Sequence, residues 1–261
     1  MRKRMSVTKS SQQVHRASIH LMLEPRDHVR RKANLGLRKM ERSFEPEILD
    51  GRDVTEEEAS RSYHELANIH RLLGNTHYLI HTLQSDPLPI RRVLDVGCGR
   101  GDVLRDITRA LGVEGIGIDL SPGQAEGGHI VEADALNDVL PEADVAYSTF
   151  VAHHLSEPDL IRMIRNVGRS CRRFILLDLV RCRALLAPFR IFIAPFVSPI
   201  TATDGQTSIR RAYTVRELRA VVSRALCGTN ATFSHFLGPL CIRQVIDISY
   251  TQEGTTTILS K

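Results

Sequence analysis

Tryptophan is absent from the 261 residues, and the five cysteines include no C-x-x-C pair. Because the cysteines are scattered singly, they lack the paired spacing of a structural zinc site, and we expect no metal site. Their odd number also gives no disulfide framework, so we expect reduced thiols in a cytoplasmic protein.

Long apolar runs are also missing. The longest charge-free run in the apolar part of the second half, residues 191–203, has 13 residues and contains two prolines. A bilayer span takes about 20 residues. No apolar segment of a secretory signal follows the basic first residues. We therefore expect no stable membrane insertion.

Acidic residues are scarce in residues 1–39, where 11 Lys/Arg stand beside only 2 Asp/Glu. The rest of the chain holds 24 basic and 28 acidic residues, so the net charge of +5 comes from this first segment. We predict that residues 1–39 are a flexible arm, and we expect no nucleic-acid partner for the folded core.

Four interpretations of the arm stay open. Met40 begins a segment of abruptly different composition, which suits an arm that lies ahead of the true start. No acid precedes Glu24, which is typical of organelle-targeting segments. Basic residues also suit contact with RNA or anionic lipid. Plain disorder is the fourth interpretation.

Residues 40–88 are predicted to form a helical cap. Thr55 and Glu58 fit a capping box, apolar residues then recur at helical spacing, and Gly74 is a natural helix stop. A second helix is expected over residues 76–83.

Residues 89–261 are predicted to form an α/β domain, because short apolar runs alternate with helical patterns. Strands are expected over residues 92–96, 115–120, 129–133, 145–148 and 174–179, helices over 102–111 and 157–167, and an antiparallel hairpin over 231–249. This alternation predicts a doubly wound, mostly parallel sheet.

An apolar insertion is expected at about residues 181–213, broken by prolines and dotted with arginines. It is interpreted either as a short helix packed on the cap or as a lid over an apolar substrate. A dip into a membrane surface is a minor alternative. Its arginines, Arg181, Arg210 and Arg211, either bind an acidic group of the substrate or are ion-paired or solvated.

The most informative segment is V-L-D-V-G-C-G-R-G at residues 93–101, a strand that leads through a glycine-rich turn into a helix. Glycines let a ligand approach the backbone, and a helix N-terminus presents free N–H groups. Asp102 replaces the third glycine of the dinucleotide pattern and would face a pyrophosphate unfavourably. Asp95 suits a cationic amino-acid group, and Asp119 can accept ribose hydroxyls. The pattern favours adenosylmethionine over NAD.

The run VLDVGCGRGDVLRDI resembles motif I of class I S-adenosylmethionine-dependent methyltransferases. GIGIDLSP resembles their second-strand motif, and EADAL resembles the segment that holds adenine. STFVAHHLSEPD resembles the stretch after the fourth strand in quinone and small-phenol methyltransferases. Beyond this match, which spans residues 91–179, ELANIHRLLG and DGQTSIRRAYTVRELRAV resemble a bacterial subgroup that accompanies polyketide-type pathways.

The resemblance implies a Rossmann-like, seven-stranded sheet, S-adenosyl-L-methionine as cofactor and a small-molecule acceptor. The glycines would line the methionine part of the cofactor. Asp95 would help to hold the ammonium group of the cofactor, and Asp119 would hold its ribose. Asp134 would read the adenine, and Thr149 would lie near the transferable methyl. The full set of implied cofactor-binding residues is Asp95, Gly97, Cys98, Gly99, Gly101, Asp119, Leu120, Asp134, Ala135, Thr149 and Phe150.

His153 and His154 are the candidate catalytic bases, with His154 favoured. Packing at the start of a helix is the alternative for both. Asp178 ends the fifth expected strand, where it either orients the acceptor or caps a loop. A base is needed only where the acceptor loses a proton, as a phenol does. No DPPY or NPPY motif follows the fourth strand, which argues against methylation of nucleic-acid amines.

The connection between Asp119 and Asp134 departs from the family pattern. Its 14 residues include three glycines, so at most a turn fits where such enzymes place a helix. This departure affects the packing of that sheet face and the shape of the adenine pocket.

We predict a methyltransferase for a small, apolar, hydroxylated acceptor, such as a phenol, a quinone or a polyketide-like compound. Three alternatives stay open: an RNA methyltransferase that uses the basic arm, a non-catalytic protein that binds the cofactor, and an NAD-dependent enzyme, which the glycine spacing disfavours.

Overall fold

The computed structural model describes residues 40–51, 53–122 and 129–250, except for the side chain of Leu240. The predicted arm, residues 1–39, lies outside the described residues. None of the helices in the described ranges combines the length and the apolar character that a bilayer span requires.

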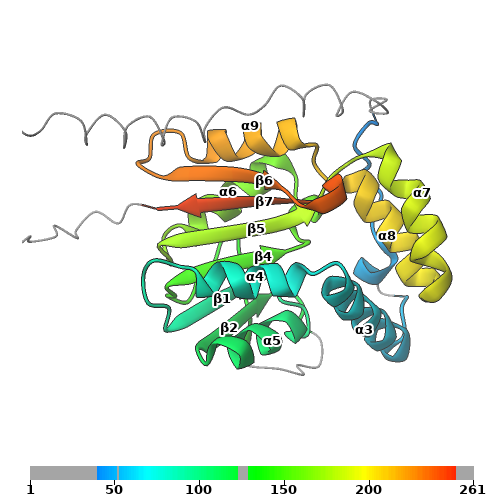
Figure 1. Cartoon of the computed structure of the whole chain (residues 1–261), viewed down its shortest axis with the longest axis horizontal. Coiled ribbons are helices and arrows are strands. Elements are labelled where there is room, and N and C mark those ends of the chain that lie inside the picture. Colours follow the sequence, from blue (N-terminus) through cyan, green and yellow to red (C-terminus); the bar gives the residue numbers. More distant parts are fainter. Residues whose placement is uncertain (1–39, 52, 123–128, 251–261) are drawn as a thin grey trace, which may run out of the picture. The chain divides into compact units, whose positions relative to one another are not determined.

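A seven-stranded sheet has the order β3-β2-β1-β4-β5-β7-β6 (Figure 1). The parallel strands are β1 (Arg92–Val96), β2 (Glu114–Asp119), β3 (His129–Glu132), β4 (Val145–Thr149) and β5 (Arg173–Leu179). β7 (Arg243–Ser249) pairs antiparallel with both β5 and β6 (Thr232–Leu237). The predicted mostly parallel sheet with a C-terminal antiparallel hairpin is confirmed.

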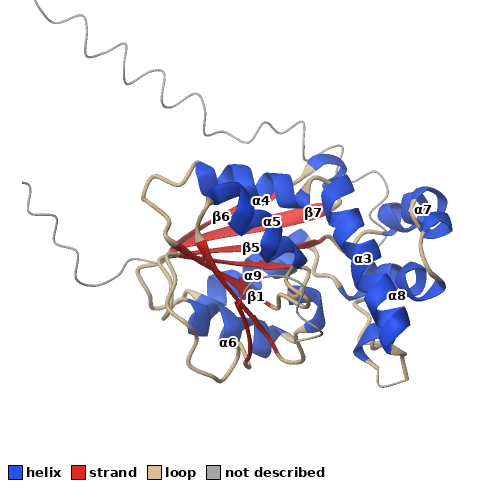
Figure 2. Ribbon diagram, turned by 90° about the horizontal axis from the view of Figure 1, so that it is seen from below, coloured by secondary structure: helices blue, strands red, loops and turns tan. Residues whose placement is uncertain are grey.

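Four helices cover the two faces of the sheet (Figure 2). They are α4 (Asn75–Gln84) and α5 (Asp102–Leu111) on one face, and α6 (Glu157–Val167) and α9 (Val215–Ala225) on the other. Successive β5 residues point to opposite faces: Phe174 and Leu176 pack with α6 and α9, whereas Ile175 and Leu177 pack with α4. Because both faces are buried, this strand is a continuous apolar run rather than an alternating one.

Short sequence signals determine where the helices begin. Thr55 and Glu58 form a complete capping box at the start of α3 (Glu56–Leu72), and Thr214 and Glu217 form another at α9. Gly74 adopts a φ of 67° between α3 and α4, in the left-handed region that favours glycine. The helix boundaries expected at Thr55 and Gly74 are confirmed.

Three helices gather beyond the carboxyl ends of the parallel strands, in a helical layer that both views show (Figures 1 and 2). They are α3, α7 (Arg183–Phe192) and α8 (Pro199–Arg211). Helix α8 contacts α3, α7 and the short 3-10 helix η1 (Ile48–Asp50). Part of the predicted cap and the predicted insertion therefore form one layer at the sheet edge where α/β proteins bind ligands.

The connection from β2 to β3 is short, as expected. Residues 120–122 are not helical, and residues 123–128 lie outside the described part of the chain. Asp119 pairs in register with Glu132, so the two parallel strands still end side by side.

The core placement gives a stability prediction. Ile164 of α6 is fully buried against the sheet, whereas Val139 is 98% exposed. We expect Ile164→Ala to lower the free energy of unfolding by about 2–5 kcal/mol, because the substitution leaves a cavity in the core. Val139→Ala should change it by less than about 0.5 kcal/mol. Urea denaturation measures both values, and equal losses would contradict this core.

Candidate functional site

A cavity of about 1050 Å³ lies between the strand ends and the helical layer. Its sheet side is formed by the glycine turn after β1 and by the ends of β2 and β4, and its other side by α3, α7 and α8. Pockets for one small ligand usually measure roughly 300–1,000 Å³. The cavity therefore has room for a cofactor and an acceptor together.

The glycine turn needs left-handed backbone at three positions. Gly97, Gly99 and Gly101 have φ values of 74°, 55° and 81°. A Cβ added to Gly97 would lie 2.4 Å from Cγ2 of Val151, so glycine is required there for space as well as for conformation. Gly97 and Gly99 line the cavity, whereas Gly101 lies outside its wall as the N-cap of α5.

Asp119 holds the glycine turn against the end of β2. Its Oδ2 accepts the backbone N–H of Gly99 at 2.8 Å, and its Oδ1 accepts that of Ser121 at 3.0 Å. A carboxylate has about four acceptor positions, so Asp119 keeps capacity for ligand hydroxyls. The predicted carboxylate at the strand end thus stands at the cavity wall.

The structure brings six other predicted residues to the same cavity. They are Cys98, Leu120, Asp134, Ala135, Thr149 and Phe150. Phe150 has a φ of 56°, which is unusual for a residue other than glycine, and its ring centroid lies 4.4 Å from that of His70. Strained backbone of this kind concentrates at functional sites.

Asp95 is the predicted acid that stands outside the cavity wall. Its side chain is buried behind the glycine turn, and burial raises the pKa of its carboxyl to about 8. The group is therefore largely protonated at neutral pH in this structure. Its role in binding an ammonium group stays a prediction.

Asp178 orients His153. Its Oδ1 lies 2.8 Å from His153 Nδ1, and its Oδ2 accepts the His153 backbone N–H at 2.7 Å. Both side chains are buried, and His153 lines the cavity. The contact needs β5 and the short helix η2 (Ala152–His154), which follows β4, to lie side by side. The preferred base, His154, receives no such support from Asp178.

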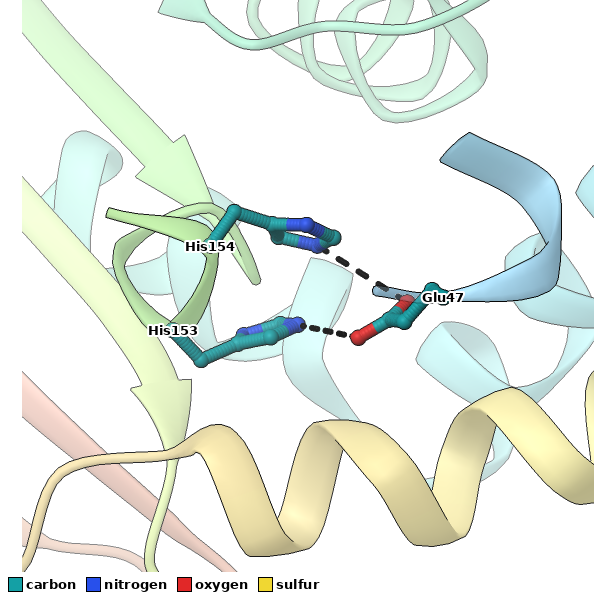
Figure 3. A group of neighbouring side chains, drawn as sticks. All are labelled: Glu47, His153 and His154. Atoms are coloured by element: carbon teal, nitrogen blue, oxygen red, sulfur yellow. Dashed lines mark ion pairs between the residues drawn. The ribbon is translucent and has the colours of Figure 1, made fainter. Parts of the chain in front are cut away.

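Glu47 faces both imidazoles from one side, and its carboxylate oxygens bridge them (Figure 3). Its Oε1 lies 3.4 Å from His153 Nε2, and its Oε2 lies 3.8 Å from His154 Nε2. His154 is more exposed, and its Nδ1 lies 3.2 Å from Asp50 Oδ2. Each histidine therefore has a carboxylate at Nδ1 and shares Glu47 at Nε2.

Two carboxylates control the protonation of His153. Burial alone lowers the pKa of His153, but the charges and hydrogen bonds of Asp178 and Glu47 outweigh it and raise this pKa to about 9. Burial also raises the pKa of Glu47, yet His153 keeps it below its usual value. At neutral pH the buried group is an imidazolium between two carboxylates.

The same three side chains have the spacing of possible metal ligands. Glu47, His153 and His154 each bring one ligand atom within 4.8 Å of the others. Arg211 Nη1 lies 4.0 Å from Glu47, and protonated His153 adds a second positive charge. Glu47 thus has positive partners within the protein, and the expectation of no metal stays a prediction.

Two of the three predicted arginines are ion-paired. Arg181 donates to both carboxylate oxygens of Glu217, and Arg211 lies 3.4 Å from Asp50. Arg210 borders a separate hollow beside α7. None of the three lines the main cavity, so the geometry favours the structural alternative over binding of an acidic substrate group.

Sequence reasoning missed several polar side chains of the cavity, among them Tyr63, His70, Glu47 and Asp50. Tyr63 and His70 lie seven residues apart on α3, a spacing that places them on one helix face and was a usable signal. Glu47 is the N-cap of η1 and Asp50 is its last residue. The backbone N–H groups of Ile48 and Leu49 in this turn donate to the carboxylate of Asp204. No local pattern marks that turn, because its partner lies 155 residues away along the chain.

The glycine turn gives a second prediction. Gly112 has a φ of 67° and nothing within 4 Å of an added Cβ, so Gly112→Ala carries only conformational strain of about 1–2 kcal/mol. Gly97→Ala carries the same strain and a clash with Val151. We expect a clearly larger decrease of the melting temperature for Gly97→Ala. Equal decreases in thermal unfolding would show that Val151 does not press on the turn.

The sequence matches a family model for a methyltransferase domain over residues 55–180. That range contains the glycine turn, strands β1–β5, His153 and Asp178. No curated protein sequence matches the chain.

Solved methyltransferase structures share the fold. The plantazolicin methyltransferase BpumL in complex with SAH is 11% identical over 78% of this chain and 93% of its own, with a TM-score of 0.59. The plantazolicin methyltransferase BamL is 14% identical over 75% and 91%, with a TM-score of 0.59. Human N-acetylserotonin methyltransferase in complex with SAM is 14% identical over 83% and 64%, with a TM-score of 0.55. Residues 55–180 thus match a methyltransferase domain that contains the glycine turn, and this match together with the shared fold supports an S-adenosylmethionine-dependent methyltransferase.

Proposed function

We propose that the chain methylates a small, apolar, hydroxylated acceptor of the phenol, quinone or polyketide type. The observation that carries this proposal is the continuous cavity, which has the carboxylates of Asp119 and Asp134 at the strand ends and an apolar wall on the α7 side. Two fold neighbours are named for small or peptide-derived molecules, plantazolicin and N-acetylserotonin, which supports an acceptor of that size.

The polar half of the cavity fits the cofactor. The backbone of Gly97 and Gly99 would line the methionine part, Asp119 would accept the ribose hydroxyls, and Asp134 would bind the adenine. Thr149 would lie near the sulfur. When bound, the cofactor supplies an electrophilic methyl group on a sulfonium.

The other half of the cavity suits an apolar acceptor. Leu185, Phe189 and Ile193 approach from the α7 side, and Leu66 and Ile69 from α3. Such a lining removes water from the reacting atoms and gains free energy by burying apolar surface. This half of the cavity also favours a small molecule over the RNA of the alternative interpretation, which rests on residues 1–39.

A phenol must lose its proton to become a good nucleophile. We assign that proton to Nε2 of His153 in its neutral form, whose fraction grows as the pH approaches the His153 pKa of about 9. Asp178 holds the opposite ring nitrogen and so fixes the ring. His153 would take the hydroxyl proton of the acceptor as the acceptor oxygen receives the methyl group. The bound cofactor would supply that methyl group and keep the electrons of the broken C–S bond. Positioning of acceptor and methyl supplies the rest of the acceleration. His154, held by Asp50, is the second candidate.

The cofactor site gives a third prediction. SAH binds the native state only, so it must raise the melting temperature, by the equivalent of about 2.7 kcal/mol at 100 times its Kd. We expect Asp119→Ala to lose most of this rise, because the ribose loses its acceptor. Glu114→Gln, at the exposed opposite end of β2, is the matched control and should keep it. A full rise in Asp119→Ala, or a rise with NAD in place of SAH, would contradict this site.

The proton acceptor gives a fourth prediction. A base acts only when neutral, so kcat/KM for an alkylphenol should rise with pH through the His153 pKa of about 9. Glu47→Gln removes a charge that raises this pKa, so the rise should move to lower pH. His153→Asn should lower kcat by about 10²–10⁴-fold while SAH still binds.

The control variant for this pH profile is chosen from the charged and titratable groups around His153. They are Asp178, Glu47, His154, Arg42 and Arg211. Asp50→Asn changes the partner of His154 and leaves Asp178 and Glu47 in place, so its pH profile should match the wild type. A profile that moves in Asp50→Asn would instead assign the base to His154, which is the histidine that Asp50 contacts.

A further inference from the structure

Helix α7 is apolar in sequence, yet no residue of it is fully buried. Ile191 and Phe192 at its end are 62% and 71% exposed, and Phe196 in the following 3-10 helix η3 (Ala194–Phe196) is 82% exposed. Exposed aromatic and β-branched side chains clustered along one short segment mark an interaction surface rather than a random surface feature. This outer surface of α7 and η3 is called the α7 face below.

The α7 face carries charge of one sign. No Asp or Glu occurs between Asp178 and Asp204. A hollow of about 630 Å³ beside α7 is bordered by Arg183 and Arg190 of α7 and by Arg210 of α8, together with apolar side chains such as Leu186 and Ile191. None of these three arginines forms an ion pair with a carboxylate in the described ranges. The face therefore combines apolar side chains with uncompensated positive charge.

The same helix also forms part of the cavity wall. Phe192 is exposed and also lines the cavity. Leu72, at the end of α3, likewise lines the cavity, and its side chain is 78% exposed. The α7 face is thus continuous with the apolar half of the cavity. An apolar molecule bound at this face would lie beside the proposed acceptor site.

We propose that the α7 face adsorbs to an anionic lipid surface and that the apolar acceptor enters the cavity from that surface. Amphipathic helices with arginine beside large apolar residues bind in this way, since lipid phosphates neutralise the arginines while the apolar side chains sit among the acyl chains. The second clause rests on the proposed function, whereas adsorption itself does not.

A second copy of the chain fits the α7 face less well. A two-fold interface through this face would set Arg183, Arg190 and Arg210 against their own copies, and no acid of the segment from residue 179 to residue 203 is present to offset the repulsion. Charge complementarity therefore points to an anionic surface.

The absence of tryptophan allows a direct test on the full chain. Phe196→Trp places the only tryptophan on the α7 face, and Val139→Trp places it at a site that is 98% exposed. Each variant is mixed with vesicles of phosphatidylcholine alone or with added phosphatidylglycerol. We expect a blue shift and protection from an aqueous quencher for Phe196→Trp with phosphatidylglycerol only, and no change for Val139→Trp.

The design separates the α7 face from the basic residues 1–39. Attraction of those residues to anionic vesicles would bring both variants to the membrane without protecting position 196. Adding Arg183→Gln and Arg190→Gln to Phe196→Trp should weaken the protected state by at least about tenfold. Vesicle binding of Phe196→Trp without protection of its tryptophan, equal protection in both variants, or a blue shift that appears without lipid through self-association would overturn the proposal.

SAH binding is measured on the same variants. Vesicle protection without SAH binding would keep the adsorption and reject the proposed function. SAH binding without vesicle protection would reject the adsorption and leave the proposed function standing.

Discussion

The carboxylate of Asp178 is the contact on which the shape of the site depends. It holds both the ring and the backbone N–H of His153, and His153 in turn meets Glu47. Glu47 also accepts a hydrogen bond from Ser208 of α8. One chain of charged hydrogen bonds therefore runs from the end of β5 to the helical layer. A buried charged group that loses its partner costs free energy. These contacts therefore hold the helical layer over the strand ends, and the cavity lies between the two.

The two halves of the cavity differ in how they are built. The cofactor half consists of strand ends and a glycine turn, which Asp119 locks to the sheet through Gly99. The acceptor half consists of helices that contribute few residues to the core around the sheet. Helix α7 has no buried residue at all. A rigid cofactor site beside a lightly anchored acceptor wall lets one fold keep its methyl donor while its acceptors vary.

The signals that predicted the fold are local. The strands β1–β5, the capping box at Thr55 and the glycine turn follow from periodicity and turn chemistry within a few residues. The choice between His153 and His154 is not local, because it depends on β5 lying beside β4 and so placing Asp178 next to His153. Glu47 escaped prediction for the same reason, and the cavity wall excludes Asp95 because β1 turns that side chain into the core. The flexible arm expected over residues 1–39 stays a prediction.

The most direct test of this account is a single-turnover reaction of the full chain with S-adenosylmethionine and a phenol bearing a long alkyl chain. The account predicts one equivalent of SAH and one of the methyl ether, with much slower transfer to the same phenol without the chain. Binding of SAH with no methylated product from either phenol would contradict it and would identify a protein that binds the cofactor without catalysis.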